Sequence, residues 1–151
     1  MPDEFQDLIN KLTSLGGDVL QQAERTALTE VGKLVQEALV TLTPVQSGVP
    51  EGLLKPGQLA ESMKARVHIA TDTSTVDKAD VSRVTIGPTT QVCKDVANWI
   101  ENGHINARAN KGEKRTDPNP FIRTAQDETE EAAVETYQSI MTAAVTAAMG
   151  K

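Results

Sequence analysis

The sequence predicts an α+β fold with long N-terminal helices, a small antiparallel β-hairpin, a short helix and a long C-terminal helix. Three observations predict it. Apolar residues recur at helical spacing near both ends of the chain, apolar and polar residues alternate in two short central runs, and clusters of Pro and Gly separate these segments. The length of 151 residues, without an internal repeat, predicts a single domain over residues 1–151, with exposed loops at about 43–57 and 104–118.

The N-terminal third predicts helix. Apolar residues fall on one helical face between residues 3 and 15, and again between residues 18 and 42. Gly16-Gly17 interrupts the pattern, and Asp18 with Gln21 fits a reciprocal capping box at the start of the second segment. We therefore expect either one broken helix or a short helix followed by a long one.

Two central runs predict the strands of the hairpin. Residues 59–63 predict a helical turn that leads into the first strand. Each strand alternates between an apolar and a polar face, which is the pattern of a half-buried strand. Between the strands lies a polar segment, residues 72–80, so an antiparallel pair is expected. The apolar face carries Ala65, Val67 and Ile69 from the first strand and Val84 and Ile86 from the second; the polar face carries Lys64, Arg66, His68, Arg83 and Thr85.

Residues 91–102 return to helical spacing, with Val92, Val96, Trp99 and Ile100 as the apolar positions. We expect Trp99 and Ile100 to anchor this short helix in the core. Glu101 is expected to pair with a basic residue or to cap a backbone. Asn102 and Gly103 end the helix, because both residue types accept the left-handed backbone conformation.

The last helix is expected to begin with Asn119 as its N-cap and Pro120 in its first turn. Its apolar stripe would extend for roughly 45 Å. Because the small hairpin could not cover that length, part of the stripe is expected to pack on another element or another subunit. The stripe comprises Phe121, Ala125, Ala133, Tyr137, Ile140, Ala144 and Ala148.

No pattern for catalysis or for cofactor or metal binding is found. The two imidazoles, His68 and His104, lack metal-ligand spacing, and nucleophile-elbow, P-loop and dinucleotide-binding motifs are absent. The lone Cys93 is expected to be a small buried residue. We therefore predict no enzyme activity and no catalytic, cofactor-binding or metal-binding residues.

The net charge of −6 argues against a general nucleic-acid binder, since such proteins usually carry a basic excess. No apolar run approaches the roughly 20 residues that cross a membrane. The acidic N-terminus lacks the features of a signal peptide, so synthesis in the cytoplasm is expected. One loop is nevertheless basic, with Arg108, Lys111, Lys114 and Arg115. It could bind an acidic partner surface, including another copy of the chain, contact a passing duplex, or simply be solvated.

Five segments follow one another in a recognisable order. A helix ends in Thr43-Pro44-Val45-x-Ser47-Gly48, and Leu59-Ala60-x-Ser62-Met63 leads into a strand. A second strand ends in Val84-x-Ile86-Gly87. Val96-Ala97-x-Trp99-Ile100-Glu101-x-Gly103 comes next, and Asn119-Pro120-Phe121-Ile122-Arg123-x-Ala125 opens the last helix. Together they resemble the tail-completion or neck proteins of long-tailed phages, the gene-product-ten-like family, over roughly residues 20–145. Two departures are a longer loop after Ser47-Gly48 and His104 where the family pattern has Thr.

The resemblance implies a structural protein of the virion, made in the host cytoplasm, that completes or joins the tail at the head–tail junction. It implies a ring of identical subunits, expected to be a hexamer, with other neck or tail proteins as partners, no membrane, and DNA only as it passes through the ring. The alternatives are a tail-terminator or head-closure subunit and a small nucleic-acid-associated protein that uses the basic loop 108–115.

A ring needs two complementary patches on each subunit, because its contacts are heterologous. We expect the basic loop to meet the acidic first turns of the last helix, Asp127, Glu128, Glu130 and Glu131, across the subunit interface or on a neighbouring ring. A second set of residues is expected to be structural: Trp99, Glu101, Gly103, Pro120, Phe121 and Arg123.

Overall fold

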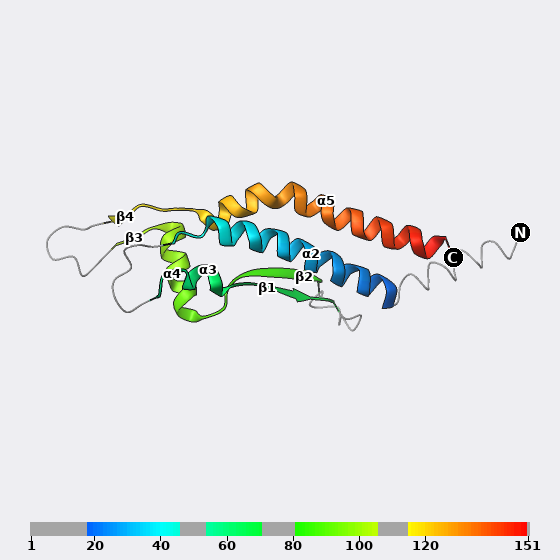
Figure 1. Cartoon of the computed structure of the whole chain (residues 1–151), viewed down its shortest axis with the longest axis horizontal. Coiled ribbons are helices and arrows are strands. Elements are labelled where there is room, and N and C mark those ends of the chain that lie inside the picture. Colours follow the sequence, from blue (N-terminus) through cyan, green and yellow to red (C-terminus); the bar gives the residue numbers. More distant parts are fainter. Residues whose placement is uncertain (1–17, 46–53, 71–80, 106–114, 151) are drawn as a thin grey trace, which may run out of the picture. The chain divides into compact units, whose positions relative to one another are not determined.

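The computed structural model describes residues 18–45, 54–70, 81–105 and 115–150 (Figure 1). The predicted α+β arrangement is confirmed: a long helix, an antiparallel two-stranded hairpin, a short helix and a long C-terminal helix. The expected helix over residues 3–15 and most of the two predicted loops lie outside the described residues. In chain order the elements are α2 (Asp18–Leu42), α3 (Gln58–Ser62), β1 (Met63–His68), β2 (Arg83–Pro88), α4 (Gln91–Asn102), β3 (His104–Ile105), β4 (Arg115–Thr116) and α5 (Phe121–Met149).

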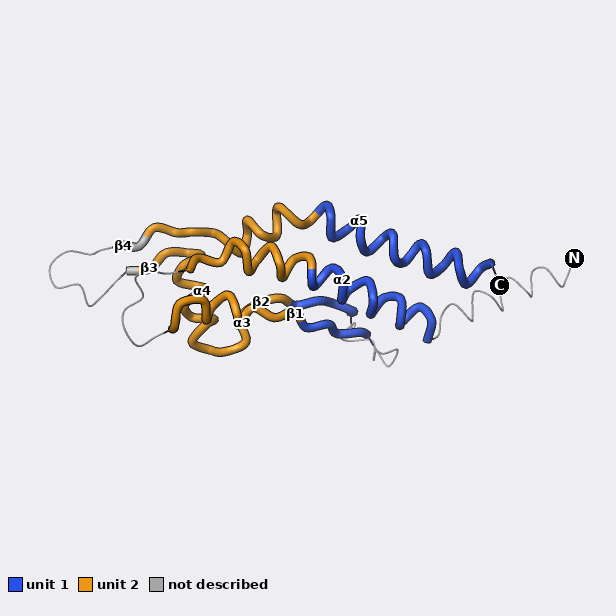
Figure 2. Tube along the Cα trace, viewed as in Figure 1, with its two compact units in different colours: residues 1–33, 66–85, 131–151 blue, residues 34–65, 86–130 orange. Residues whose placement is uncertain are grey.

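The chain divides into two compact units, each made of several segments (Figure 2). Unit 1 comprises Met1–Lys33, Arg66–Thr85 and Glu131–Lys151, and unit 2 comprises Leu34–Ala65 and Ile86–Glu130. The two long helices, α2 and α5, therefore contribute residues to both units. That residues 1–151 form a single domain stays a prediction.

The hairpin has the alternation that the sequence predicts. In β1 the exposed positions are Lys64, Arg66 and His68, while Ala65 and Val67 are half-buried. In β2 Arg83 and Thr85 are exposed, and Val84 and Ile86 are half-buried. One face of the hairpin is thus apolar and the other carries cationic side chains.

The core of unit 2 is built from every helix that enters it and from the first residue of β1. Met63 and Cys93 are fully buried there, so the expectation for Cys93 is confirmed. The Gln36 side chain of α2 ties the β1 end to this core, because its Nε2 donates to the Met63 carbonyl at 2.9 Å. The buried cluster comprises Leu39, Leu59, Met63, Cys93, Val96, Ala97, Phe121 and Ala125.

Unit 1 has a thinner apolar interior. Ala27 of α2 is the one fully buried apolar side chain among its described residues. From Glu131 to Gly150 the described α5 side chains are half-buried or exposed, and Val134 and Met149 are both about half exposed. That part of this helix packs on another element or on another subunit stays a prediction.

The predicted loop over residues 104–118 is more ordered at its ends than expected. β3 and β4 pair antiparallel, with His104 opposite Thr116 and Ile105 opposite Arg115. A two-residue ladder is too short to leave an alternation pattern in the sequence, so the sequence predicts a loop there.

Candidate functional site

The candidate site is the junction where α4 ends and α5 begins, within unit 2. α4 starts at its N-cap Thr90, whose side chain accepts from the Cys93 N–H at 3.3 Å. Residues at helical spacing then turn toward the core, and the last of them is Glu101, which is only 7% exposed. A carboxylate at so buried a position needs compensating donors.

Three N–H groups of α5 supply them. The Ile122 N–H donates to Glu101 Oε2 at 2.8 Å, and the Arg123 N–H donates to Glu101 Oε1 at 3.2 Å. The Arg123 side-chain Nε donates to the same Oε1, also at 3.2 Å. The prediction that Glu101 pairs with a basic residue or caps a backbone is confirmed in both respects.

The Glu101 carboxylate therefore does the work of an N-cap for α5. Thr124 N donates to the Pro120 carbonyl at 2.9 Å, so Pro120 is the residue that precedes the first helical turn. Its side chain has no acceptor, whereas Glu101 satisfies the next two free N–H groups and places negative charge at the positive end of the helix dipole. Our assignment of Asn119 as the N-cap was wrong by one residue, and the cap comes from another helix.

Asn119 and Asn102 complete the junction. The Asn119 N–H donates to the Ile100 carbonyl at 2.8 Å, which joins the segment before α5 to the end of α4. The Asn102 side-chain oxygen accepts from Arg123 Nη2 at 3.2 Å. Gly103 then turns the chain with φ 72° and ψ 161°, so the expected positive φ is found at Gly103. Asn102 itself is the last residue of the helix.

The expectation that Trp99 anchors α4 in the core was wrong. Trp99 is 39% exposed and Val92 is 45% exposed, while Cys93 and Ala97 occupy the buried positions beside them. The buried face of α4 is thus rotated by one residue from the predicted stripe, because two small side chains pack there. The Trp99 ring instead stacks on His104, with ring centroids 5.6 Å apart and planes inclined by 30°. Ile100 does pack against the core, as expected.

The remaining predicted site residues are placed as follows. Phe121 is buried, Pro120 is exposed, and the acidic residues Asp127, Glu128, Glu130 and Glu131 are all exposed. Of the basic loop, Arg108, Lys111 and Lys114 lie outside the described residues, and for Arg115 only the backbone is described. The expected contact between the basic loop and the acidic turns therefore stays a prediction.

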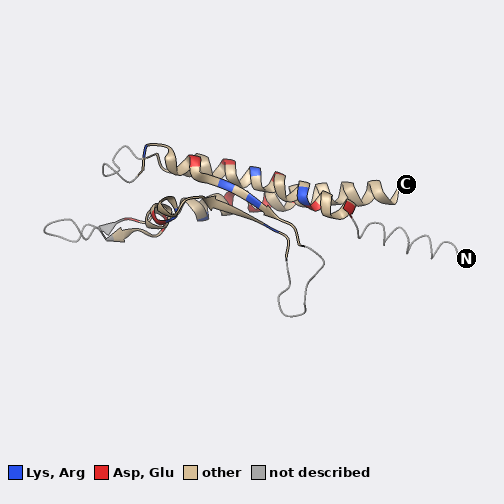
Figure 3. Cartoon of the chain, turned by 90° about the horizontal axis from the view of Figure 1, so that it is seen from below, with Lys and Arg blue, Asp and Glu red and all other residues tan. Residues whose placement is uncertain are grey.

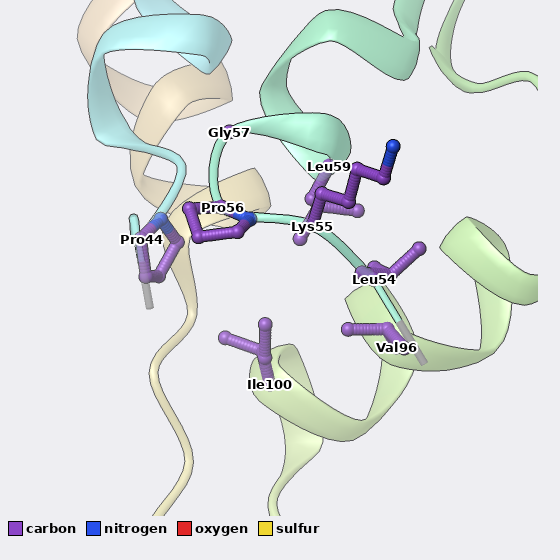
Figure 4. A pocket seen from close by; sticks show the side chains of 8 residues that line it. All are labelled: Pro44, Leu54, Lys55, Pro56, Gly57, Leu59, Val96 and Ile100. Carbon is purple, nitrogen blue, oxygen red and sulfur yellow. The ribbon is translucent and has the colours of Figure 1, made fainter. Parts of the chain in front are cut away.

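A small hollow lies beside the junction, also within unit 2 (Figure 4). Its empty space of about 260 Å³ includes open solvent, and only about 20 Å³ can hold the centre of a water molecule, far below the roughly 300–1,000 Å³ of typical ligand pockets. Its lining carries one titratable side chain, Lys55, and no carboxylate, imidazole or thiol. The lining comprises Pro44, Leu54, Lys55, Pro56, Gly57, Leu59, Val96 and Ile100.

Among the described residues no group of three or more His, Cys, Asp or Glu side chains could hold a metal ion. None of the described helices is long and apolar enough to cross a membrane.

What the described junction can do chemically is hold two helices in a fixed arrangement. The Glu101 oxygens are occupied by the N–H groups of α5.

One set of residues was not singled out by sequence reasoning. Arg66 and Arg83 both lie on the exposed face of the hairpin, on neighbouring strands. The period-two alternation predicts their orientation, but two arginines 17 residues apart form no local run of charge like that of residues 108–115.

Compared with known protein families, with curated proteins and with solved structures, the chain matches none.

Proposed function

We propose that the chain is a structural subunit of the head–tail junction of a long-tailed phage, which assembles with copies of itself into a ring and completes or joins the tail. The proposal starts from the order and spacing of the motifs that resemble the tail-completion or neck proteins. One structural observation supports it most: Glu101, from the segment that ends Trp99-Ile100-Glu101-x-Gly103, caps Ile122 and Arg123, from the segment that opens the last helix.

The earlier motif segments reach the same part of unit 2. Pro44, from the first segment, and Leu59, from the second, line one hollow together with Ile100, from the fourth. The backbone carbonyl of Ser62, in the second segment, accepts a hydrogen bond from the Thr89 N–H at 3.1 Å. This bond holds the base of the hairpin together. Segments far apart in sequence thus share one packing arrangement, as expected of motifs that preserve the shape of a subunit.

The motif side chains are used for folding and not for chemistry. Glu101 is buried and satisfied by backbone and guanidinium donors, Phe121 is in the core, and Gly103 adopts a backbone conformation suited to glycine. A candidate enzyme site would need titratable groups that converge on a pocket. The described hollow lacks such a group of residues, which favours an assembly role over catalysis.

The long helices favour a role in assembly as well. α5 has 29 residues and would extend for about 43 Å. Its described part beyond Glu131 has no fully buried side chain in the isolated chain. Contacts with neighbouring subunits would cover such a surface, and a ring would supply them.

Immunogold labelling of virions from a phage that encodes the chain tests the proposal. Label at the head–tail junction is the expected result, and ring-shaped particles of the purified chain should be visible by negative-stain microscopy. Label on the capsid shell or tail fibres, or its absence from virions, would contradict the proposal. Salt-sensitive retention on DNA without rings would favour the nucleic-acid alternative. Cross-linking to the tail tube or to the connector separates terminator and head-closure roles.

The basic loop has its own test. Changing Lys111, Lys114 and Arg115 to Glu should weaken assembly and leave the monomer folded, as measured by light scattering and circular dichroism. Unchanged assembly would remove this loop from the subunit interface without bearing on the location of the protein in the virion.

A further inference from the structure

The exposed face of the β1–β2 hairpin is basic in a chain of net charge −6. Arg66 and Arg83 lie on this face in unit 1, and Lys64 and His68 flank Arg66 along β1. Neither Arg66 nor Arg83 has an ion-pair partner among the described residues. Figure 3 shows basic residues along the strands and residues of both charges along the helices. We call Arg66 and Arg83 the basic face.

A complementary set lies on the first turns of α5. Asp127, Glu128 and Glu130 are exposed, and within the described part of the chain none of their carboxylates has a hydrogen-bond or ion-pair partner. Glu131 follows them along the helix. We call Asp127, Glu128 and Glu130 the acidic face. Unpaired charges of opposite sign on two surfaces of one chain favour contact between copies.

The spacing of the charges is compatible with a contact between the hairpin and a helix. Arg66 and Arg83 stand on neighbouring strands, and neighbouring strands lie about 4.7–4.9 Å apart. Along α5, Asp127 and Glu130 are separated by a rise of about 4.5 Å. The two long arginine side chains can therefore reach carboxylates that lie about one helical turn apart.

We propose that the basic face of one copy binds the acidic face of the next copy in the assembled ring. This inference rests on the proposed function and names the surfaces through which its subunits meet. The contact is heterologous, because two different patches of the same chain come together, and contacts of this kind are what a closed ring requires. A nucleic-acid backbone is the less favoured occupant, since the net charge of −6 repels a polyanion.

The variant Arg66→Glu/Arg83→Glu tests the contact in the full-length chain. It juxtaposes like charges across the interface, which should raise the subunit dissociation constant by roughly 10- to 100-fold at low salt. Sedimentation velocity measures the effect, and added salt should weaken the wild-type assembly because exposed charges are screened. Both arginines are exposed, so circular dichroism should show an unchanged fold.

The matched control is Arg25→Glu/Lys94→Glu. Arg25 and Lys94 are also exposed and have no ion-pair partner among the described residues, and the control changes the net charge by the same amount. It should assemble like the wild type. A four-residue charge exchange, with Glu128→Lys/Glu130→Lys added to Arg66→Glu/Arg83→Glu, should restore assembly because both faces have then changed sign.

Several outcomes would overturn the contact: wild-type assembly of Arg66→Glu/Arg83→Glu, an equal loss in the control, no restoration by the charge exchange, or a wild-type chain that stays monomeric up to its solubility limit. If Arg66→Glu/Arg83→Glu loses retention on DNA while its self-association is unchanged, the basic face binds nucleic acid. If immunogold label lies at the head–tail junction but the four-residue charge exchange does not restore assembly, only this contact is rejected. If the chain forms rings that depend on these charges but is absent from virions, only the proposed function is rejected.

Discussion

Arg123 donates twice to one oxygen of Glu101: its backbone N–H and its side-chain Nε–H both lie 3.2 Å from Glu101 Oε1. The two partners differ in exposure, with 68% of the Arg123 side chain accessible and 8% of the Glu101 side chain. The Ile122 N–H holds the other carboxylate oxygen. The junction therefore depends mainly on the buried Glu101 carboxylate, and the exposed Arg123 side chain adds one further hydrogen bond.

Glu101→Ala should destabilise the chain by about 2–3 kcal/mol, because two N–H groups at the start of α5 lose a charged acceptor. Glu101→Gln keeps one acceptor oxygen and should lose less. Urea denaturation followed by circular dichroism measures both. The control is Glu128→Ala, an exposed carboxylate of α5 without a partner in the described chain, which should change stability by less than about 0.5 kcal/mol. Equal effects of Glu101→Ala and Glu128→Ala would contradict the capping role.

Arg123→Ala should cost no more than about 1 kcal/mol, since an exposed ion pair contributes little. The same denaturation experiment gives the value. A loss as large as that of Glu101→Ala would mean that the guanidinium, and not the backbone cap, holds the junction together.

Gly103→Ala should destabilise the chain by about 1–3 kcal/mol, because its backbone has φ 72° and ψ 161°, a region that is almost confined to glycine. Gly87→Ala is the matched control: an added Cβ there would meet no atom within 4 Å, and its φ is not positive. Thermal unfolding of the two variants provides the comparison. Equal midpoints would show that the turn after α4 adapts to a side chain.

Met63→Ala should destabilise the chain by about 2–5 kcal/mol, because Met63 is fully buried and its truncation leaves a cavity in unit 2. Met63→Leu conserves volume and should cost less than about 1.5 kcal/mol. Denaturant titration distinguishes them, and the buried Cys93 thiol should label faster in the alanine variant. A small effect of Met63→Ala would indicate that the surrounding side chains collapse into the space.

The chain should lose stability at alkaline pH through Tyr137. Burial, and to a lesser extent the charge of Glu24, raise the pKa of Tyr137 above its ordinary value of 10.0. The folded state therefore favours the neutral phenol. This contribution is fully present below pH 10.0, the unfolded value, and is lost as pH rises through the raised pKa.

Tyr137 is the only tyrosine, so its absorbance titration is unambiguous. The tyrosinate midpoint should fall when the chain is unfolded in urea, and Glu24→Gln should lower the midpoint in the folded chain by a smaller amount. Tyr137→Phe should flatten the alkaline loss of stability. Identical midpoints in folded and unfolded chains would contradict the prediction.

Part of the candidate site was predictable from sequence. Glu101 was expected to pair or cap because it follows the apolar positions of α4, and a positive φ was expected near the end of that helix. The partners were not predictable. Ile122 and Arg123 lie 21 and 22 residues further along the chain. No spacing rule relates a carboxylate in one helix to N–H groups at the start of another.

By itself, the sequence determined that α2 and α5 become helices and that β1 and β2 become strands, because the periods of their apolar residues report local backbone geometry directly. It did not determine the two-residue strands β3 and β4, which are too short to show a period. Only the tertiary structure decided which side of α4 is buried and which residue caps α5. Trp99 has a larger apolar surface than Ala97. Ala97 nevertheless occupies the closely packed position of α4, and the Trp99 ring lies partly exposed outside the core. Likewise, the cap belongs to Glu101 and not to the neighbouring Asn119, because the fold brings the end of α4 to the free N–H groups of α5.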